Sequence, residues 1–415
     1  MPELVDVAVV GGGVLGLSTA RALLRARPEL SVAVLEKEPR WGAHQSGHNS
    51  NVIHSGLYYT PGGLKARMAR AGGEAMIRYC EQHEVAVRRT GKIVVATAED
   101  QLPALELLAE RGRANGVTAH RLGRAEIAER EPHVAGVAAL AVDETAMTDF
   151  GGVCRAMAGE LAEWGADLRT NSPALSFSAA GERTVVRTTS GELRARVVVN
   201  CAGLHSDRVA TALGERPSVR IMPVRGEYAE LSPSRRGLVN NPIYPVPDPD
   251  LPFLGVHATP MLDGAVHVGP NAVPALARQG YRWRDVDLRM LGELLRDPAL
   301  RGLARRYWRY GAAEISRSLV WPLFVRDVRR LLPEVTSRDL HRHGSGVRAQ
   351  AVTADGRLVD DFVIQRTRGA VHVLNAPSPA ATSSLPIGRS VAADAFEQLQ
   401  LDDLARTLRE DLAST

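Results

Sequence analysis

Hydrophobic residues near the start of the chain switch from the spacing of a strand to the spacing of a helix. Residues 5–10 form a β-branched run, and alanines, leucines and arginines then recur at helical spacing from residue 17 to residue 27. A second β-branched run covers residues 31–35. This pattern predicts a strand, a tight turn, a helix and a second strand, which is the order of a βαβ unit.

The predicted turn carries a glycine-rich hexapeptide, Gly11-Gly-Gly-Val-Leu-Gly16. We expect Gly11 to let the chain turn, Gly13 to let the backbone approach a pyrophosphate, and Gly16 to let the helix pack on the strand. Glu36 follows the second strand, 20 residues beyond Gly16, where an acid accepts the hydroxyls of an adenosine ribose. Together these features predict a dinucleotide site at the helix N-terminus.

Two later segments indicate that the chain returns to this site. Residues 197–203, VVVNCAG, predict a buried parallel strand that enters a turn of small residues. Near the C-terminus, residues 371–376 predict a further strand, and the small residues 377–384 precede a helix expected from about Gly388. Such returns suit a long cofactor such as FAD, because the late helix N-terminus can face the electron-rich pyrimidine end of the flavin.

Residues 45–59, QSGHNSNVIHSGLYY, closely resemble the loop after the glycine fingerprint in the L-2-hydroxyglutarate oxidases and dehydrogenases. These enzymes belong to the FAD-dependent D-amino-acid oxidase-like superfamily. The resemblance continues through residues 63–67, 223–228, 243–249, 252–257, 269–272, 346–350, 356–362 and 375–381, and so covers almost the whole chain. One departure is Asn51, where glycine is usual. Asparagine tolerates a positive φ better than other non-glycine residues, so we expect the loop to keep its shape.

The resemblance implies oxidation of L-2-hydroxyglutarate to 2-oxoglutarate by hydride transfer from C2 to flavin N5, with electrons passed to a quinone or to oxygen. Two other functions stay open: a related flavin oxidase of an amino acid or another 2-hydroxy acid, and an FAD-binding protein without enzymatic activity. The residues expected to bind FAD are Gly11, Gly13, Val14, Leu15, Gly16, Glu36, Lys37, Gln45, Ser46, Asn49, Ser50, Ala202, Gly203, Ser378, Pro379, Ala380, Ala381 and Thr382.

Oxidation of a 2-hydroxy acid requires a base for the hydroxyl proton. His54, just before the loop at residues 55–59, is the first candidate because a neutral imidazole can take that proton. In some relatives of this superfamily a histidine in this neighbourhood carries the flavin covalently. A covalent tether and an ordinary packed or capping histidine are therefore rival roles. His257 is the second candidate for the base or for a carboxylate contact.

The same reaction requires clamps for the carboxylates of the substrate. Arg348 resembles the carboxylate-binding arginine of amino-acid oxidases in this superfamily, and a guanidinium binds a carboxylate through two parallel bonds. The alternative is a solvated surface arginine in an arginine-rich chain. A five-carbon diacid needs a second clamp, for which the candidates are Tyr59, Lys65, Arg225, Tyr244 and Asn271.

The expected fold is α/β, with a Rossmann-type FAD-binding domain interleaved with a substrate domain that contains a mixed or antiparallel sheet. The FAD-binding domain is expected to comprise residues 1–90, 150–215 and 340–415, and the substrate domain residues 91–149 and 216–339. In the substrate domain we expect strands at residues 93–97 and 265–268 and helices at residues 101–113 and 286–296.

Composition excludes several other classes of protein. The net charge of +4 comes without a poly-basic tail, so we expect no nucleic-acid partner. Cys80, Cys154 and Cys201 form no C-x-x-C pair, so neither a disulfide framework nor a zinc ribbon is expected. No cleavable apolar leader and no apolar run of about 18–20 residues is visible, which favours a cytoplasmic protein.

Two weaker patterns remain. His341 and His343 are two residues apart, so on a strand both side chains point to the same face, as metal ligands could. No third ligand stands at a useful spacing, so no metal is expected. Residues 301–330 hold eight arginines against Glu314 and Asp327, together with five aromatic residues. This window predicts either a solvated helical face or peripheral contact with an anionic bilayer at the inner face of the cell membrane, which would favour a quinone acceptor.

Overall fold

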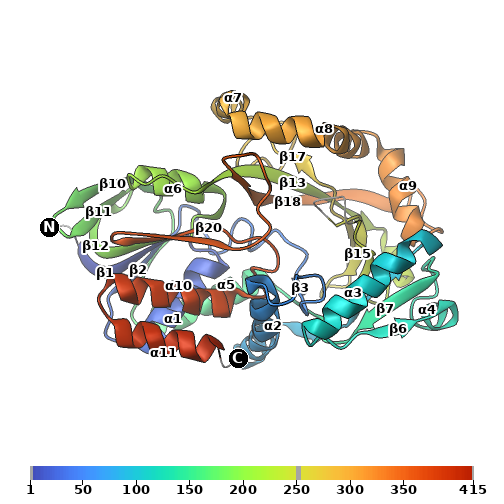
Figure 1. Cartoon of the computed structure of the whole chain (residues 1–415), viewed down its shortest axis with the longest axis horizontal. Helices are drawn as coiled ribbons and strands as arrows, with labels where there is room; N and C mark the ends of the chain where they lie inside the picture. The colour runs from blue at the N-terminus through green and yellow to red at the C-terminus, as the bar shows by residue number, and fades with distance from the viewer. Residues whose placement is uncertain (1–2, 249–253, 414–415) are drawn as a thin grey trace.

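The computed structural model describes residues 3–248 and 254–413, and these contain two large sheets with helices packed on them (Figure 1). Pro249 of the motif at residues 243–249 lies outside the described residues, as do Pro252 and Phe253 of the motif at residues 252–257. The first two and last two residues of the expected FAD-binding domain are likewise outside them.

The first sheet is built on parallel strands in the order β9-β2-β1-β12-β20. Their bounds are β1 (Glu3–Val10), β2 (Val32–Leu35), β9 (Asp167–Arg169), β12 (Gly191–Asn200) and β20 (Ala370–Asn375), and the antiparallel strands β10 (Ala174–Ala180), β11 (Arg183–Thr188) and β19 (Val363–Thr367) extend the sheet. Val10 pairs with both Leu35 and Asn200, so neighbouring strands end at one edge. The segments that begin at Gly11, Glu36 and Cys201 therefore meet there.

Alternate side chains of β1 pack into two different cores. Val7 and Val9 face helices on one side of the sheet, whereas Ala8 and Val10 belong to the core on the other side, with residues of β11 and α6. The helices of the first side are α1 (Val14–Ala26), α5 (Phe150–Glu163) and α10 (Ser384–Gln398), with α11 (Asp402–Ala413) outside α10, and α6 (Ser206–Ala212) lies on the opposite side (Figure 1). This arrangement confirms the predicted α/β fold.

The helix expected from about Gly388, α10, begins earlier than the sequence indicated. It starts at Ser384 instead of about Gly388. Pro386 lies in its first turn, where backbone amides have no helical acceptor, so the amide hydrogen that proline lacks is not needed. Gly388 is a packing position inside the helix: a Cβ atom there would lie 2.6 Å from the Ser18 carbonyl carbon of α1. The glycine permits close helix packing and does not mark the helix start.

The second sheet has the order β17-β13-β16-β15-β14-β5-β7-β6, with β18 also paired to β13. Its strands are β5 (Lys92–Ala96), β6 (His120–Leu122), β7 (Ala138–Val142), β13 (Val219–Leu231), β14 (Ile243–Pro245), β15 (His257–Pro260), β16 (Val266–Gly269), β17 (Val273–Pro274) and β18 (Leu340–Thr353). All the pairings are antiparallel except that between β14 and β5, which confirms the predicted mixed sheet.

Helices cover this second sheet as the sequence predicted for the 101–113 and 286–296 regions. They are α3 (Leu102–Ala114), α7 (Leu288–Arg296), α8 (Pro298–Leu319) and α9 (Trp321–Leu331). The other helices of the described chain are α2 (Leu64–Gln82) and α4 (Arg124–Arg130), with short 3-10 turns at η1 (Glu99–Gln101), η2 (Gly203–His205) and η3 (Pro233–Leu238). No helix in residues 3–248 or 254–413 is both long enough and apolar enough to cross a membrane.

The strand pairing corrects one limit of the expected domains. The sequence places residues 340–353 in the FAD-binding domain, but they form β18, which pairs with β13 over almost its whole length and so belongs to the second sheet. The partner strand lies more than 100 residues upstream, so no local pattern reveals the pairing. A small third sheet, of β3 (Val52–Ile53), β8 (Ala146–Thr148) and β4 (Val87–Arg89), joins segments that the sequence assigned to different domains.

Candidate active site

A cavity of about 1050 Å³ extends from the carboxyl edge of the first sheet to the second sheet. Gly11 and Glu36 line it at one end, directly after β1 and β2. Tyr228 of β13, Tyr244 of β14 and Arg348 of β18 line it at the other. The cavity therefore joins the predicted nucleotide site to the sheet of the expected substrate domain.

The glycines at the nucleotide end have the geometry that the sequence predicted. Gly11 has φ +112°, and a Cβ atom there would lie 2.4 Å from the Cys201 carbonyl oxygen. A Cβ atom on Gly16 would lie 1.9 Å from the Gly11 carbonyl oxygen, so the helix can approach the turn only with glycine. A larger residue at either position would push apart the strand ends that form this end of the cavity.

Glu36 is fixed at the rim of the same end. Its side chain accepts hydrogen bonds from the backbone amides of Gly12 at 2.8 Å and Glu38 at 2.9 Å, and the residue is 7% exposed. Each carboxylate oxygen can accept more than one hydrogen bond, so acceptor capacity remains for a ribose. The glycine turn, the start of α1 and this oriented acid together fit the ADP part of FAD.

Of the residues expected to bind FAD, all except Gly16 line this cavity. They are Gly11, Gly13, Val14, Leu15, Glu36, Lys37, Gln45, Ser46, Asn49, Ser50, Ala202, Gly203, Ser378, Pro379, Ala380, Ala381 and Thr382. Gly16 lies behind the turn and serves helix packing. Asn51 has φ +57° and does not line the cavity, so asparagine adopts the left-handed conformation as expected and its side chain leaves the cavity wall unchanged.

His54 follows β3 at the far end of the cavity. Its backbone amide donates to the Thr382 hydroxyl at 3.0 Å, which ties it to the loop before α10. Among the described residues, its buried ring atom Nδ1 has no hydrogen-bond partner. Burial, with smaller contributions from the charges of Lys92 and His257, lowers the pKa of His54 to about 3, so the ring is neutral at pH 7.

His257 lies near His54 and is also neutral. Its ring stacks on Tyr244 with 4.3 Å between centroids and 17° between planes. Nδ1 lies 3.1 Å from the Gly255 carbonyl oxygen, so Nδ1 carries the proton and Nε2 the lone pair. Burial, opposed by the hydrogen bond to Gly255 and assisted by the charges of Arg348 and Lys92, lowers the pKa of His257 to about 4.

Cationic side chains reach the same cavity. Arg348 lies on β18 opposite Val224, and its charge also reaches Tyr228. Lys65 lies on α2, with its Nζ 2.8 Å from an Asp360 carboxylate oxygen and 5.5 Å from the centre of the Tyr59 ring. The structure thus brings six of the predicted catalytic or clamp residues into one cavity: His54, Tyr59, Lys65, Tyr244, His257 and Arg348.

Arg225 and Asn271, two predicted clamps, do not line the cavity. Arg225 is fully buried, donates to Glu227 at 3.0 and 3.2 Å, and lies 4.4 Å from the Trp283 ring centre. The Asn271 amide accepts from the Glu227 backbone at 2.8 Å and donates to its carboxylate at 2.9 Å. Both side chains are engaged with Glu227, so the structure does not bring these two predicted clamps to the cavity.

Lys92 is a neighbour of this site that the sequence analysis did not select. It is 2% exposed, its Nζ lies 4.4 and 5.3 Å from the ring centres of Tyr58 and Tyr244, and it has no hydrogen-bond partner among the described residues. Burial lowers its pKa to about 7. One signal was available: the chain has only three lysines, and the other two, Lys37 and Lys65, line the cavity.

With this geometry in view, comparison with known proteins defines the class. Residues 6–394 match the family model DAO, FAD dependent oxidoreductase, and the chain belongs to this family. The match confirms FAD as the cofactor. The computed fold agrees: a structure titled dithionite reduced L-alpha-glycerophosphate oxidase from Mycoplasma pneumoniae with FAD bound matches with TM-score 0.75 at 22% identity, covering 96% of this chain and 95% of that one.

Within that class, curated relatives confirm the more specific resemblance. A protein of Nematostella vectensis named L-2-hydroxyglutarate dehydrogenase, mitochondrial, is 42% identical, and the match covers 96% of this chain and 92% of the relative. A protein of Salmonella houtenae named L-2-hydroxyglutarate dehydrogenase is also 42% identical, with 97% and 96% covered. The likeness therefore extends over almost the full length of both chains.

Proposed function

We propose that the protein oxidises L-2-hydroxyglutarate to 2-oxoglutarate. The observation that carries the proposal is the 42% identity to relatives of that name along nearly their full lengths. The composition of the cavity is consistent with it, since neutral imidazoles and cationic side chains line one space with the expected flavin-binding residues. When bound, the flavin supplies the acceptor for the hydride that leaves carbon 2 of the substrate.

His54 is the proposed base for the hydroxyl proton. Its neutral ring has a buried nitrogen without a partner in the described chain, so that nitrogen can accept a proton from a substrate hydroxyl. The low pKa in the ligand-free cavity rises when a dicarboxylate binds, because negative charge nearby favours the imidazolium. The substrate thereby strengthens its own base, and His257 remains the second candidate.

Arg348 and Lys65 are the proposed clamps for the two carboxylates. Arg348 offers two parallel donors, which suits the carboxylate next to the reacting carbon because that end must be oriented precisely. Lys65 is a point charge beside Tyr59, which suits the distal carboxylate. Asp360, its present partner, has a 96% exposed side chain, so exchanging that ion pair for a substrate carboxylate requires little desolvation.

Anaerobic titration of flavin absorbance tests the function. L-2-Hydroxyglutarate, D-2-hydroxyglutarate, lactate and a set of amino acids are added separately to the FAD-loaded protein. We expect the L-enantiomer alone to bleach the flavin. Bleaching by lactate or an amino acid instead would support the related oxidase, and a flavin that none of these compounds reduces would contradict an enzymatic role for this substrate class.

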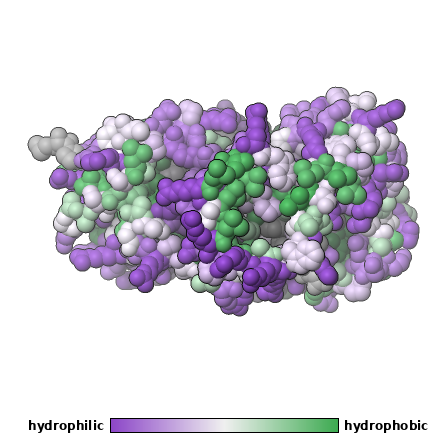
Figure 2. Space-filling view, turned by 90° about the horizontal axis from the view of Figure 1, so that it is seen from above, coloured by the Kyte–Doolittle hydropathy of each residue, from purple (hydrophilic) through white to green (hydrophobic). Residues whose placement is uncertain are grey.

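We further propose that the electrons pass to a quinone at a membrane surface formed by α7 and α8. Figure 2 shows apolar side chains gathered among hydrophilic ones on this face. The strongly exposed apolar residues of the two helices are Leu288 at 78%, Leu295 at 73%, Trp308 at 62% and Leu319 at 61%. Exposed arginines accompany them on α8 at positions 301, 305, 306 and 309. Apolar side chains beside cations suit an anionic bilayer.

Of the five aromatic residues between positions 301 and 330, only one is strongly exposed on this surface. Phe324 is 4% exposed and stacks with Trp321 at 5.3 Å in the core under α9. Tyr307 and Tyr310 are partly buried, which leaves Trp308 as the strongly exposed one. The leucines of α7, outside the window, supply the rest of the proposed contact.

Co-sedimentation with phosphatidylglycerol vesicles tests the surface. We expect binding at low salt that weakens at 1 M salt, where the Debye length is about 3 Å. A variant with both Leu288→Ser and Leu295→Ser should lose binding, whereas Leu107→Ser, an exposed leucine on α3, should keep it. Fast reoxidation of the substrate-reduced enzyme by air, without vesicle binding, would contradict this proposal and leave oxygen as the acceptor.

A further inference from the structure

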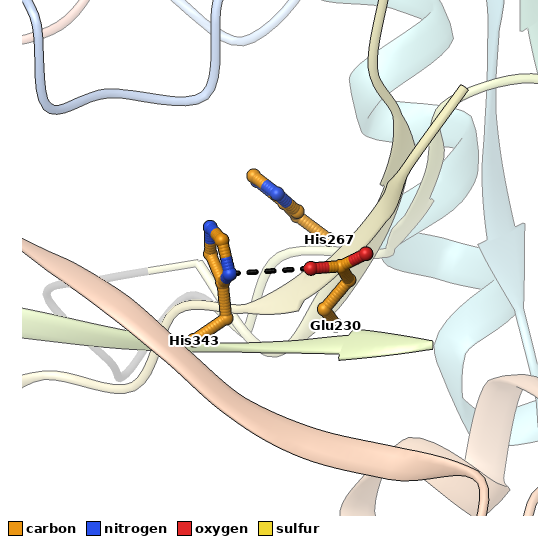
Figure 3. Close-up of side chains that lie close together, drawn as sticks. All are labelled: Glu230, His267 and His343. Atoms are coloured by element: carbon orange, nitrogen blue, oxygen red, sulfur yellow. Dashed lines mark ion pairs between the residues drawn. The ribbon is translucent and has the colours of Figure 1, made fainter. Parts of the chain in front are cut away.

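Three side chains with metal-binding atoms meet on neighbouring strands of the second sheet (Figure 3). They are Glu230 of β13, His267 of β16 and His343 of β18. Their candidate ligand atoms all lie within 4.8 Å of one another. Glu230 pairs directly with His267 across the strands, and His343 lies opposite Tyr228, two positions along β13 from Glu230.

Contacts within this cluster are already close to those of a ligand set. The Nδ1 atom of His343 lies 3.2 Å from the Oε2 atom of Glu230, and the ring centres of His267 and His343 are 4.4 Å apart. Adjacent ligand atoms in a tetrahedral zinc site are about 3.4 Å apart, because each lies about 2.0–2.2 Å from the ion. Small rotations of the side chains therefore suffice to enclose an ion.

The surroundings of the cluster resemble those of a metal site. Arg236 donates to the second oxygen of Glu230 at 2.8 Å, which holds the carboxylate in one orientation while Oε2 faces the histidines.

We propose that Glu230, His267 and His343 bind one divalent transition-metal ion, of which Zn²⁺ is the probe to use. Two imidazoles and one carboxylate suit zinc and its neighbours, whereas magnesium and calcium prefer all-oxygen sites. The His343 side chain is 46% exposed, so water can complete the coordination. The site is separate from the flavin cavity, whose lining includes none of the three residues.

His341 is excluded from the site, although the sequence paired it with His343. Its Nε2 lies 3.0 Å from the Ser232 hydroxyl, away from the cluster. The partners of His343 come instead from two other strands, at positions 75 or more residues upstream. The bound ion would link β16, β13 and β18 beside Tyr228, which lines the substrate cavity and whose ring lies 6.2 Å from that of His267.

Zinc binding to the untagged, FAD-loaded protein tests the proposal. After removal of metals with a chelator, isothermal titration with Zn²⁺ should give one ion per chain. His267→Ala and His343→Ala should each weaken binding at least about tenfold, the usual loss on removing part of a metal site. The matched control is His341→Ala, on the same strand and equally able to bind zinc adventitiously, and it should bind like the wild type.

Three results would overturn the site: binding below one ion per chain, unchanged binding by the double variant of His267 and His343, or an equal loss in His341→Ala. Flavin content and the circular dichroism of each variant without metal identify any that fail to fold. Glu230→Gln then provides an independent second variant, because it removes the ligand charge while retaining the shape of the side chain and should also weaken binding.

Discussion

The buried amine of Lys92 leads to a prediction about stability. The pKa of this lysine falls from its ordinary value of 10.5 to about 7 because burial disfavours the charged form. The folded state therefore binds the proton less strongly than the unfolded chain. The resulting destabilisation is fully present below pH 7 and disappears as the pH rises towards 10.5. Lys92→Met removes the charge and fills the same space between two tyrosine rings.

The magnitude follows from the same contacts. The fall of the pKa from 10.5 to about 7, at about 1.4 kcal/mol per pH unit, gives an upper limit of about 5 kcal/mol. The faces of Tyr58 and Tyr244 attract the ammonium group and offset about 2 kcal/mol of this. We therefore expect Lys92→Met to be more stable than the wild type by about 3–5 kcal/mol at pH 6, and by about 2 kcal/mol at pH 9.

Urea unfolding of both FAD-loaded proteins at equal flavin concentration, at pH 6, 7, 8 and 9, measures this difference. Subtracting the two curves removes the contributions of all other titrating groups. Lys65→Met is the matched control, because this lysine has a carboxylate partner whose side chain is 96% exposed. The control should change stability by less than about 1 kcal/mol.

A stability difference that stays constant from pH 6 to pH 9 would refute the reasoning. So would a Lys92→Met variant less stable than the wild type at every pH. Either result would mean that the tyrosine faces stabilise the ammonium ion enough to overcome its desolvation. The charged lysine would then make a net stabilising contact with two tyrosines that line the cavity.

Three further substitutions test the proposed site. Glu36→Ala should lower the fraction of FAD retained after gel filtration, because the ribose loses its acceptor; full retention would contradict that role, and a yellow precipitate after denaturation of the wild type would indicate a covalent flavin at His54. Arg348→Lys should raise KM about 10–100-fold in steady-state assays with unchanged flavin content, because a point charge replaces a two-donor clamp, and wild-type kinetics would contradict it. His54→Gln should lower kcat about 10²–10⁴-fold in the same assay, and a loss below tenfold would transfer the role of base to His257.

The sequence alone determined the nucleotide end of the site because the constraints there are local. Gly11 must adopt a positive φ and Gly16 must touch the preceding turn, and both requirements act between residues a few positions apart. Parallel strands that end together then bring Glu36 and the segment after Asn200 to the same edge. The sequence therefore predicted the α/β fold and the residues that gather at this end of the cavity.

Only the tertiary structure decided the roles of residues on the second sheet, since these depend on register between strands far apart in the chain. Arg225 carries the expected charge, but its strand directs it to Glu227 and away from the cavity. Lys92 becomes a cation beside the tyrosines only because β5 pairs with β14. His343 meets His267 and Glu230 through the register in which β18 and β16 pair with β13, and a shift of one residue would turn each side chain to the opposite face.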